Sequence, residues 1–297
     1  MKIIKGIIPP MITPLKGDDQ IDREGTVRLT EHILAGGVHA LFLLGTTGEA
    51  QSLSYECRYD FVELVCRQVA GRVPVLVGVT DTSLDESVKL AAHAAKCGAV
   101  AVVAAAPYYF APSQQELIEY YTALADALPL PLFLYNMPSH VKVFLEPATV
   151  KTLAEHPNIV GLKDSSANMT YFQTLLYHLG DREDFALYVG PEELTGESVV
   201  MGADGGVNGG ANIFPELYVQ MYYVNTMRAL QRKIMQISTS LYTVGKYGSS
   251  YLKGVKCSLS LMGICDDYMS YPYRRFRTEE RARIRKALEA LGTACGE

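Results

Sequence analysis

The stretch Ile159-Val160-Gly161-Leu162-Lys163 is apolar up to its last residue, and Asp164, Ser165 and Ser166 follow it directly. A short, uninterrupted apolar run is typical of a strand that is buried on both faces, as in a parallel sheet with helices on either side. The polar residues after it indicate a loop. The stretch therefore predicts an α/β fold with a parallel sheet.

Runs of the same kind recur along the chain, and their starts lie roughly 20–35 residues apart, which is the size of a βαβ repeat. They predict eight strands, at Gly6–Ile12, Ala40–Leu44, Val75–Val79, Ala99–Ala105, Leu132–Tyr135, Ile159–Lys163, Ala186–Val189 and Gly205–Val207.

Helix signals fill the intervening segments. Asp22 and Ser54 are candidate N-caps, and Ser113 with Glu116 has the spacing of a capping box. Pro147 and Pro215 each have the position of a first helical residue.

Eight βα units without an intervening linker predict a closed (β/α)8 TIM barrel, with an open doubly wound sheet as the alternative. Beyond about residue 216 the pattern is helical only. We expect the barrel and its active site in residues 1–225, and a helical extension packed on the barrel in residues 226–297.

The composition excludes several classes of protein. Of 297 residues 48% are apolar and the net charge is −5. This balance, without a basic block, argues against a nucleic-acid partner. The sequence shows no secretory segment and no apolar run of the roughly 18–20 residues that a membrane helix needs. The six cysteines form no CxxC pair and are expected to be reduced. We expect a soluble, cytoplasmic protein.

Lys163 is the residue that points to chemistry. An ammonium group at the end of a buried strand is costly unless it is paired or becomes neutral. A lysine in that setting tends to lose its proton near neutral pH and becomes a nucleophilic amine that can form a Schiff base. The alternative is a side chain that snorkels to the surface.

Other polar groups collect at the same end of the predicted barrel, where such enzymes hold their active sites. Tyr135 and Lys163 end neighbouring strands, which lie about 4.8 Å apart, so both could reach one carbonyl carbon. Thr46 and Thr47 lie in a glycine-flanked turn that could bind a carboxylate through hydroxyl and N–H groups. The set predicts a small 2-oxo acid as substrate.

Other chemistries find little support. The sequence lacks GxGxxG, Walker, HExxH and GxSxG motifs, and its histidines show no metal spacing. We expect no cofactor and no metal. A barrel acting on sugar phosphates would need a phosphate cradle after its seventh and eighth strands, where Glu192 and Glu193 stand instead.

The chain resembles the dihydrodipicolinate synthase / N-acetylneuraminate lyase family of class I aldolases. The matching motifs occur in the family's order and spacing, at Gly45-Thr46-Thr47-Gly48-Glu49, Pro107-Tyr108-Tyr109, Tyr135-Asn136-Met137-Pro138, Gly161-Leu162-Lys163-Asp164 and Gly202-Ala203-Asp204-Gly205-Gly206. The resemblance implies a TIM barrel with C-terminal helices that assembles into a homotetramer, a dimer of dimers.

It also implies roles for single residues. Lys163 is similar to the Schiff-base lysine and Tyr135 to the general acid/base. Thr46 and Thr47 match the carboxylate-binding pair, and Thr47 is also implied in a proton relay to Tyr135. Tyr109 resembles the relay tyrosine that reaches into a neighbouring subunit, and Val207 lies where a backbone carbonyl faces the substrate.

Two positions depart from the family's patterns. Where dihydrodipicolinate synthases carry an arginine for the second substrate's carboxylate, this chain has His140, although Lys142 could supply a cation. Glu192 and Glu193 are close to the acidic pair of the sialic-acid lyases, but Thr46-Thr47 differs from their Ser-Thr turn.

The sequence therefore predicts a lyase or aldolase that acts on pyruvate or a longer 2-oxo acid through a lysine Schiff base, by aldol cleavage, condensation or dehydration. Dihydrodipicolinate synthase proper is one alternative. A non-catalytic 2-oxo acid sensor is the other.

Overall fold

The computed structural model describes residues 4–223, 227–245 and 247–295. Its chain forms two compact units. The first contains the residues up to Ile8, then His39–Phe42 and Gly71–Asn208; the second contains Pro9–Val38, Leu43–Ala70 and the residues from Gly209 onward. The predicted boundary between residues 225 and 226 lies outside the described residues.

The first unit is built on an eight-stranded parallel sheet in the order β1-β10-β9-β8-β7-β6-β5-β4. The strands are β1 (Gly6–Ile7), β4 (Leu41–Leu43), β5 (Val75–Gly78), β6 (Ala101–Ala105), β7 (Leu132–Asn136), β8 (Ile159–Asp164), β9 (Ala186–Val189) and β10 (Gly205–Gly206); only Leu43 of β4 is assigned to the second unit. All eight predicted strands are confirmed, in the predicted order along the chain.

Seven of the eight strands differ from their predicted bounds, most of them by one or two residues. β1 stops at Ile7 instead of Ile12, because Pro9 and Pro10 have no N–H group to donate to a neighbouring strand. β7 and β8 each continue one residue further than expected, so Lys163 is the last residue but one of its strand.

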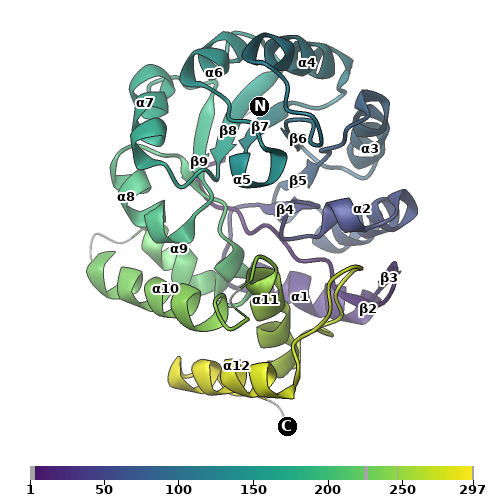
Figure 1. Ribbon diagram of the computed structural model, residues 1–297, viewed down its shortest axis with the longest axis vertical. Coiled ribbons are helices and arrows are strands. Elements are labelled where there is room, and N and C mark those ends of the chain that lie inside the picture. Colours follow the sequence, from purple (N-terminus) through teal and green to yellow (C-terminus); the bar gives the residue numbers. More distant parts are fainter. Residues whose placement is uncertain (1–3, 224–226, 246, 296–297) are drawn as a thin grey trace. The chain divides into compact units, whose positions relative to one another are not determined.

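Six helices follow the strands of this unit, and in Figure 1 they lie around the sheet except for α5, which lies over the middle of it in that view. They are α3 (Leu84–Lys96), α4 (Gln114–Ala127), α5 (Pro138–Val141), α6 (Pro147–Leu153), α7 (Met169–Leu179) and α8 (Thr195–Val200), with the short 3-10 helix η2 (Glu192–Leu194) after β9. The predicted capping box of Ser113 and Glu116 starts α4, and Pro147 is the first residue of α6.

His39 closes the sheet into a barrel. Its backbone N–H donates to the carbonyl of Ile7 at 3.0 Å, and its Nδ1 accepts the N–H of Ile7 at 3.0 Å. β1 and β4 are the two edge strands of the sheet, and these two bonds join β1 to the segment that leads into β4. Gly6 makes room for the imidazole, since a Cβ there would lie 2.3 Å from its ring. The closed barrel is therefore confirmed over the open sheet.

This seam predicts a loss of stability in acid. Burial lowers the pKa of His39 below its usual 6.5, and the bond from Ile7 needs an unprotonated Nδ1. The unfolded chain then binds more protons than the folded one below pH 6.5, so stability is complete above that pH and declines as the pH falls through it. We expect His39→Gln, which keeps an acceptor but does not titrate, to lose less stability than the wild-type protein between pH 7 and 5. Urea unfolding at each pH measures the free energy of unfolding. An equal decline of this free energy with falling pH in the variant and in the wild-type protein would contradict the prediction.

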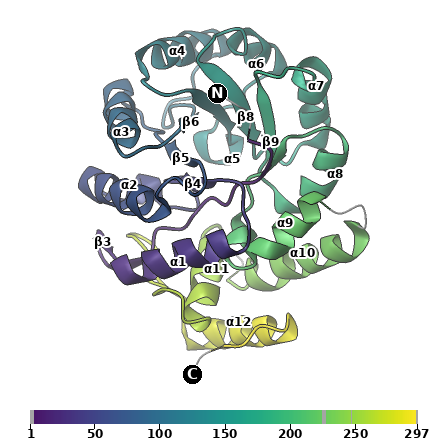
Figure 2. The same cartoon turned by 180° about the vertical axis from the view of Figure 1, so that it is seen from behind.

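The second unit holds the remaining elements. A hairpin of β2 (Leu15–Gly17) and β3 (Gln20–Ile21), which the sequence did not predict, precedes α1 (Arg23–Ala35), and η1 (Ala50–Ser52) precedes α2 (Tyr55–Val69). Asp22 and Ser54 cap α1 and α2 as predicted, and these two helices lie side by side (Figure 2).

From Gly209 onward every described element is a helix, which agrees with the helical pattern predicted beyond about residue 216. It contains η3 (Gly209–Asn212), α9 (Pro215–Tyr223), α10 (Met227–Leu241), α11 (Ser250–Leu261) and α12 (Thr278–Ala290). The helices α10, α11 and α12 pack on one another. Within the described residues, no helix has both the length and the apolar character that crossing a membrane would require.

Candidate functional site

Lys163 lies on β8 beside Tyr135 on β7, and the two residues are paired in register. Residues paired in this way point to the same face of a sheet. Both are buried, with exposed fractions of 6% for Lys163 and 5% for Tyr135. The predicted proximity of the amine and the phenol is confirmed, and the snorkelling alternative is wrong.

Aromatic rings enclose the amine. Nζ of Lys163 lies 4.2 Å from the ring centroid of Tyr135 and 5.2 Å from that of Phe42 on β4. Lys163 makes no ion pair with any described residue. An amine held among rings without a carboxylate partner keeps its lone pair within reach of a carbonyl carbon once it is deprotonated.

The neighbouring residues on these strands hold the pair in register from the opposite face. Asn136 donates through Nδ2 to Oδ1 of Asp164 at 2.8 Å, and its own Oδ1 accepts the backbone N–H of Leu145 at 3.1 Å. Asp164 also accepts two hydrogen bonds from Ser166. Burial raises the pKa of Asp164 above its usual value. These contacts fix the ends of β7 and β8, and thereby the heights of Tyr135 and Lys163.

Gly161 allows the layer beneath Lys163 to pack. A Cβ at this position would lie 2.5 Å from the ring of Phe133 and 2.5 Å from the carbonyl oxygen of Ala186. The Phe133 ring fills that space and packs against Tyr188, with ring centroids 5.7 Å apart. Packing of the Phe133 ring thus explains why the Gly161-Leu162-Lys163-Asp164 motif begins with a glycine.

The other predicted residues of the first unit lie in the segments that follow its strands. Val207, directly after β10, is 5% exposed and donates its N–H to the carbonyl of Val189 at 2.8 Å. Glu192 is buried at the start of η2. Tyr109, after β6, is 78% exposed, has a φ of 94° and packs edge-to-face with Phe110.

His140 and Lys142 belong to the short helix α5 and its end, and both are exposed. Ser139 Oγ lies 3.0 Å from Nδ1 of His140. Neighbouring atoms shield the imidazole enough to lower its pKa below 6.5.

Thr46 and Thr47 belong to the second unit, in a tight turn. Gly48 and Glu49 donate their N–H groups to the carbonyls of Gly45 and Thr46, so these two donors serve the turn itself. The backbone N–H of Thr47 makes no hydrogen bond to a described residue. The predicted anion nest is therefore reduced to three possible donors to a carboxylate: the N–H of Thr47 and the hydroxyls of Thr46 and Thr47. That they meet the substrate of Lys163 stays a prediction.

Sequence reasoning missed two residues that hold this turn. Lys256 of α11 forms an ion pair with Glu49, and both side chains are at most 1% exposed. Tyr251, on the same helix, places its OH 3.2 Å from Oγ1 of Thr47. Both lie roughly 200 residues from the turn along the chain, and no spacing rule connects positions that far apart.

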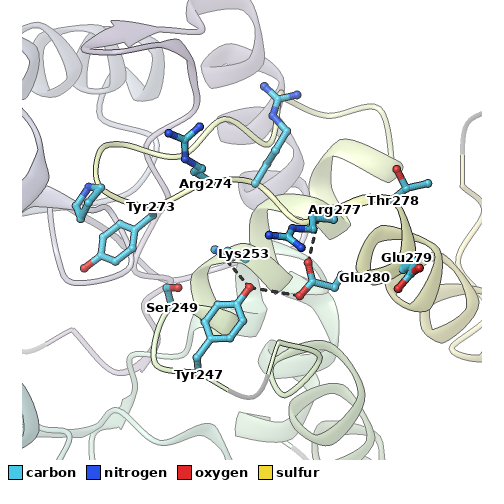
Figure 3. A pocket seen from close by; sticks show the side chains of 11 residues that line it. Tyr247, Ser249, Lys253, Tyr273, Arg274, Arg277, Thr278, Glu279 and Glu280 are labelled. Carbon is cyan, nitrogen blue, oxygen red and sulfur yellow. Dashed lines mark hydrogen bonds between the residues drawn. The ribbon is translucent and has the colours of Figure 1, made fainter.

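A pocket of about 900 Å³ lies elsewhere in the second unit (Figure 3). Its lining includes Tyr247, whose OH accepts a hydrogen bond from Lys253 at 2.9 Å and donates one to Glu280 at 3.4 Å. None of the predicted site residues lines it.

Two curated proteins illustrate what the chain is similar to. It is 35% identical over 296 residues to a 4-hydroxy-tetrahydrodipicolinate synthase of Hyphomonas neptunium, covering 97% of this chain and 98% of that protein. It is 32% identical over 301 residues to a probable 2-dehydro-3-deoxy-D-pentonate aldolase of Escherichia coli, covering 98% and 99%.

Solved structures agree with them. A dihydrodipicolinate synthase from Bacteroides thetaiotaomicron superposes with a TM-score of 0.95 at 57% identity, covering 98% of this chain and 99% of that one. The prophage protein YagE of Escherichia coli, solved in complex with pyruvate, superposes with a TM-score of 0.91 at 28% identity, covering 98% and 100%.

The model of the dihydrodipicolinate synthetase family matches residues 3–291. The protein belongs to this family and is a pyruvate-dependent class I lyase or aldolase.

Proposed function

We propose that Lys163 attacks the keto carbon of pyruvate or of a longer 2-oxo acid. Loss of water gives a protonated imine, which accepts the electron pair released when a bond at the neighbouring carbons breaks or a proton leaves. Tyr135 moves the protons, a role that contributes roughly 10²–10⁴-fold to the rate. The observation that carries the proposal is the buried Lys163 amine, 4.2 Å from the ring of Tyr135.

The carboxylate of the 2-oxo acid goes to Thr46 and Thr47 in this proposal, and the carbonyl of Val207 faces the bound substrate. The family resemblance supports these roles. The N–H of Thr47, which no described residue accepts, is a suitable donor for a carboxylate oxygen. Thr47 also passes protons to Tyr135.

His140 and Glu192 are proposed to face the second half of the substrate. An imidazole at position 140 is a poorer partner for a second carboxylate than an arginine is, because it is shorter and lacks the planar guanidinium fork. His140 therefore favours an aldolase whose acceptor aldehyde carries hydroxyls. A carboxylate-bearing acceptor, as in a dihydrodipicolinate synthase proper, is the alternative, with Lys142 as its cation.

The assembly is proposed to be a cytoplasmic homotetramer. Exposed apolar side chains of the first unit would be covered in it. Tyr109 and Phe110, whose rings pack edge-to-face, are 78% and 82% exposed, and Tyr177, Val200 and Met201 are 84%, 74% and 47% exposed. Large exposed apolar side chains that pack together, as Tyr109 and Phe110 do, mark contact surfaces between proteins. Tyr109 would enter the neighbouring subunit's site.

Borohydride trapping tests the proposal. Borohydride added to the protein with pyruvate reduces an imine to a stable amine, and we expect mass spectrometry of peptides to place the adduct on Lys163. The acceptor is tested in a separate assay without borohydride, because borohydride would itself reduce an added aldehyde. Pyruvate should be consumed faster with a polyhydroxy aldehyde than with a carboxylate-bearing aldehyde.

Lys151 on α6, an exposed lysine of the same unit, serves as the internal control and should stay unmodified. A folded protein that yields no adduct on Lys163 would disprove the mechanism. Faster consumption of pyruvate with the carboxylate-bearing aldehyde would favour the synthase over the aldolase.

A further inference from the structure

Helix α11 contacts the Gly45–Glu49 turn at two points. Lys256 pairs with Glu49, and the phenol OH of Tyr251 lies 3.2 Å from the hydroxyl of Thr47. Glu49 is also held by Ser270, whose N–H and Oγ donate to Oε2 at 2.9 and 2.6 Å. From the other side, Thr13 Oγ1 donates to the carbonyl of Gly48 at 2.7 Å. These contacts hold the turn in place, and with it the Thr47 hydroxyl that lies beside the phenol of Tyr251.

The phenol of Tyr251 is itself held in place. The ring of Tyr242 packs edge-on against it, with centroids 4.9 Å apart and planes at 80°. The hydroxyl lies over Gly209, where a Cβ would be 1.5 Å from the phenol oxygen. An alanine at 209 would therefore displace the phenol, which explains the need for glycine there.

The chemistry of the two hydroxyls sets the direction of their hydrogen bond. A phenol, with a pKa of about 10, is far more acidic than the aliphatic hydroxyl of threonine and is the better donor. Either hydroxyl could donate by geometry alone, and this acidity favours Tyr251 as the donor and Thr47 as the acceptor. The single proton of Thr47 must then point to another acceptor, and a hydroxyl that already accepts a hydrogen bond donates more strongly.

We propose that Tyr251 is a positioning residue of the reaction. By donating to Thr47 it aims the Thr47 proton at the reacting groups and strengthens that donation. The inference rests on the proposed function, in which Thr47 passes protons to Tyr135. It gives the relay an anchor within the same chain, in addition to the tyrosine of a neighbouring subunit.

The test is Tyr251→Phe, which removes one oxygen atom and keeps the ring packed on Tyr242. Exchange of the pyruvate methyl protons in D2O, followed by NMR, reports proton transfer without an acceptor aldehyde. We expect the exchange rate to fall about tenfold, as the loss of one well-placed hydrogen bond predicts. The midpoint of its pH profile should move upward, because a phenolate base then receives a weaker donor. Borohydride trapping on Lys163 should be unchanged.

Two further variants separate positioning from packing. Gly209→Ala, which displaces the phenol, should slow exchange to a similar extent. Tyr268→Phe removes another phenol of the second unit, whose OH donates to Asp18 at 2.7 Å, and should exchange at the wild-type rate.

The outcomes distinguish the two proposals. Wild-type exchange and an unmoved pH profile in Tyr251→Phe overturn the positioning role alone, while Lys163 still forms its adduct. Parallel loss of trapping and exchange shows that Tyr251 is merely structural and overturns it as well. Absence of the adduct in the wild-type protein overturns the proposed function and this inference together.

Discussion

Lys163→Met should lower turnover by at least about 10⁴-fold, because it removes the nucleophile and with it the covalent route. Methionine has a similar length and suits the space between the Tyr135 and Phe42 rings, where the amine lies 4.2 and 5.2 Å from the ring centroids. The variant should therefore fold and still bind a carboxylate. Steady-state cleavage of a 2-oxo acid measures the loss.

Lys151→Met is the matched control, since it removes an exposed amine of the same unit, and its turnover should equal that of the wild-type protein. Circular dichroism and the thermal midpoint establish that the Lys163 variant is folded. Turnover within tenfold of the wild-type rate in a folded Lys163→Met would mean that the enzyme works without an imine at this residue.

Lys256→Met should destabilise the protein by about 3–5 kcal/mol, because it leaves the carboxylate of Glu49 buried without its cation. Both side chains are at most 1% exposed, so water cannot replace the missing partner. Ser270 still donates two hydrogen bonds to the carboxylate, which retains part of the compensation. The free energy of unfolding in urea measures the effect.

A double variant, Lys256→Met with Glu49→Gln, removes the stranded charge and should recover part of the loss. The exposed pair of Arg23 and Asp60, in the same unit and 54% and 44% exposed, provides the comparison. Arg23→Met should cost at most about 1 kcal/mol. A loss in Lys256→Met as small as this would show that the buried pair contributes no more than a surface contact.

The strands could be predicted because each is buried on both faces and so reads as an apolar run. The pairing of Tyr135 with Lys163 followed, since neighbouring parallel strands bring their ends together. The hairpin at residues 15–21 was missed because its strands have three and two residues. So short a segment carries no measurable alternation.

The support of the turn could not be predicted for a different reason. Lys256 lies in a helix that looks like any amphipathic segment, and its burial depends on Glu49, which is remote in sequence. In the sequence Glu49 is only the last residue of the Gly45–Glu49 motif, and the structure supplies its partner. Likewise, nothing local marks Tyr251 as the partner of Thr47.

The seam of the barrel has a consequence for synthesis on the ribosome. β1 pairs with β10 through Gly6 and Gly205, so the first strand to emerge finds one of its neighbours among the last. At about 5–20 residues per second, the intervening chain takes roughly 10–40 s to be made. During that time one edge of β1 is without its partner, and unpaired edges invite association with other chains. β1 has only two residues and is followed by Pro9 and Pro10, which have no N–H to donate. So short an edge offers another nascent chain few hydrogen bonds.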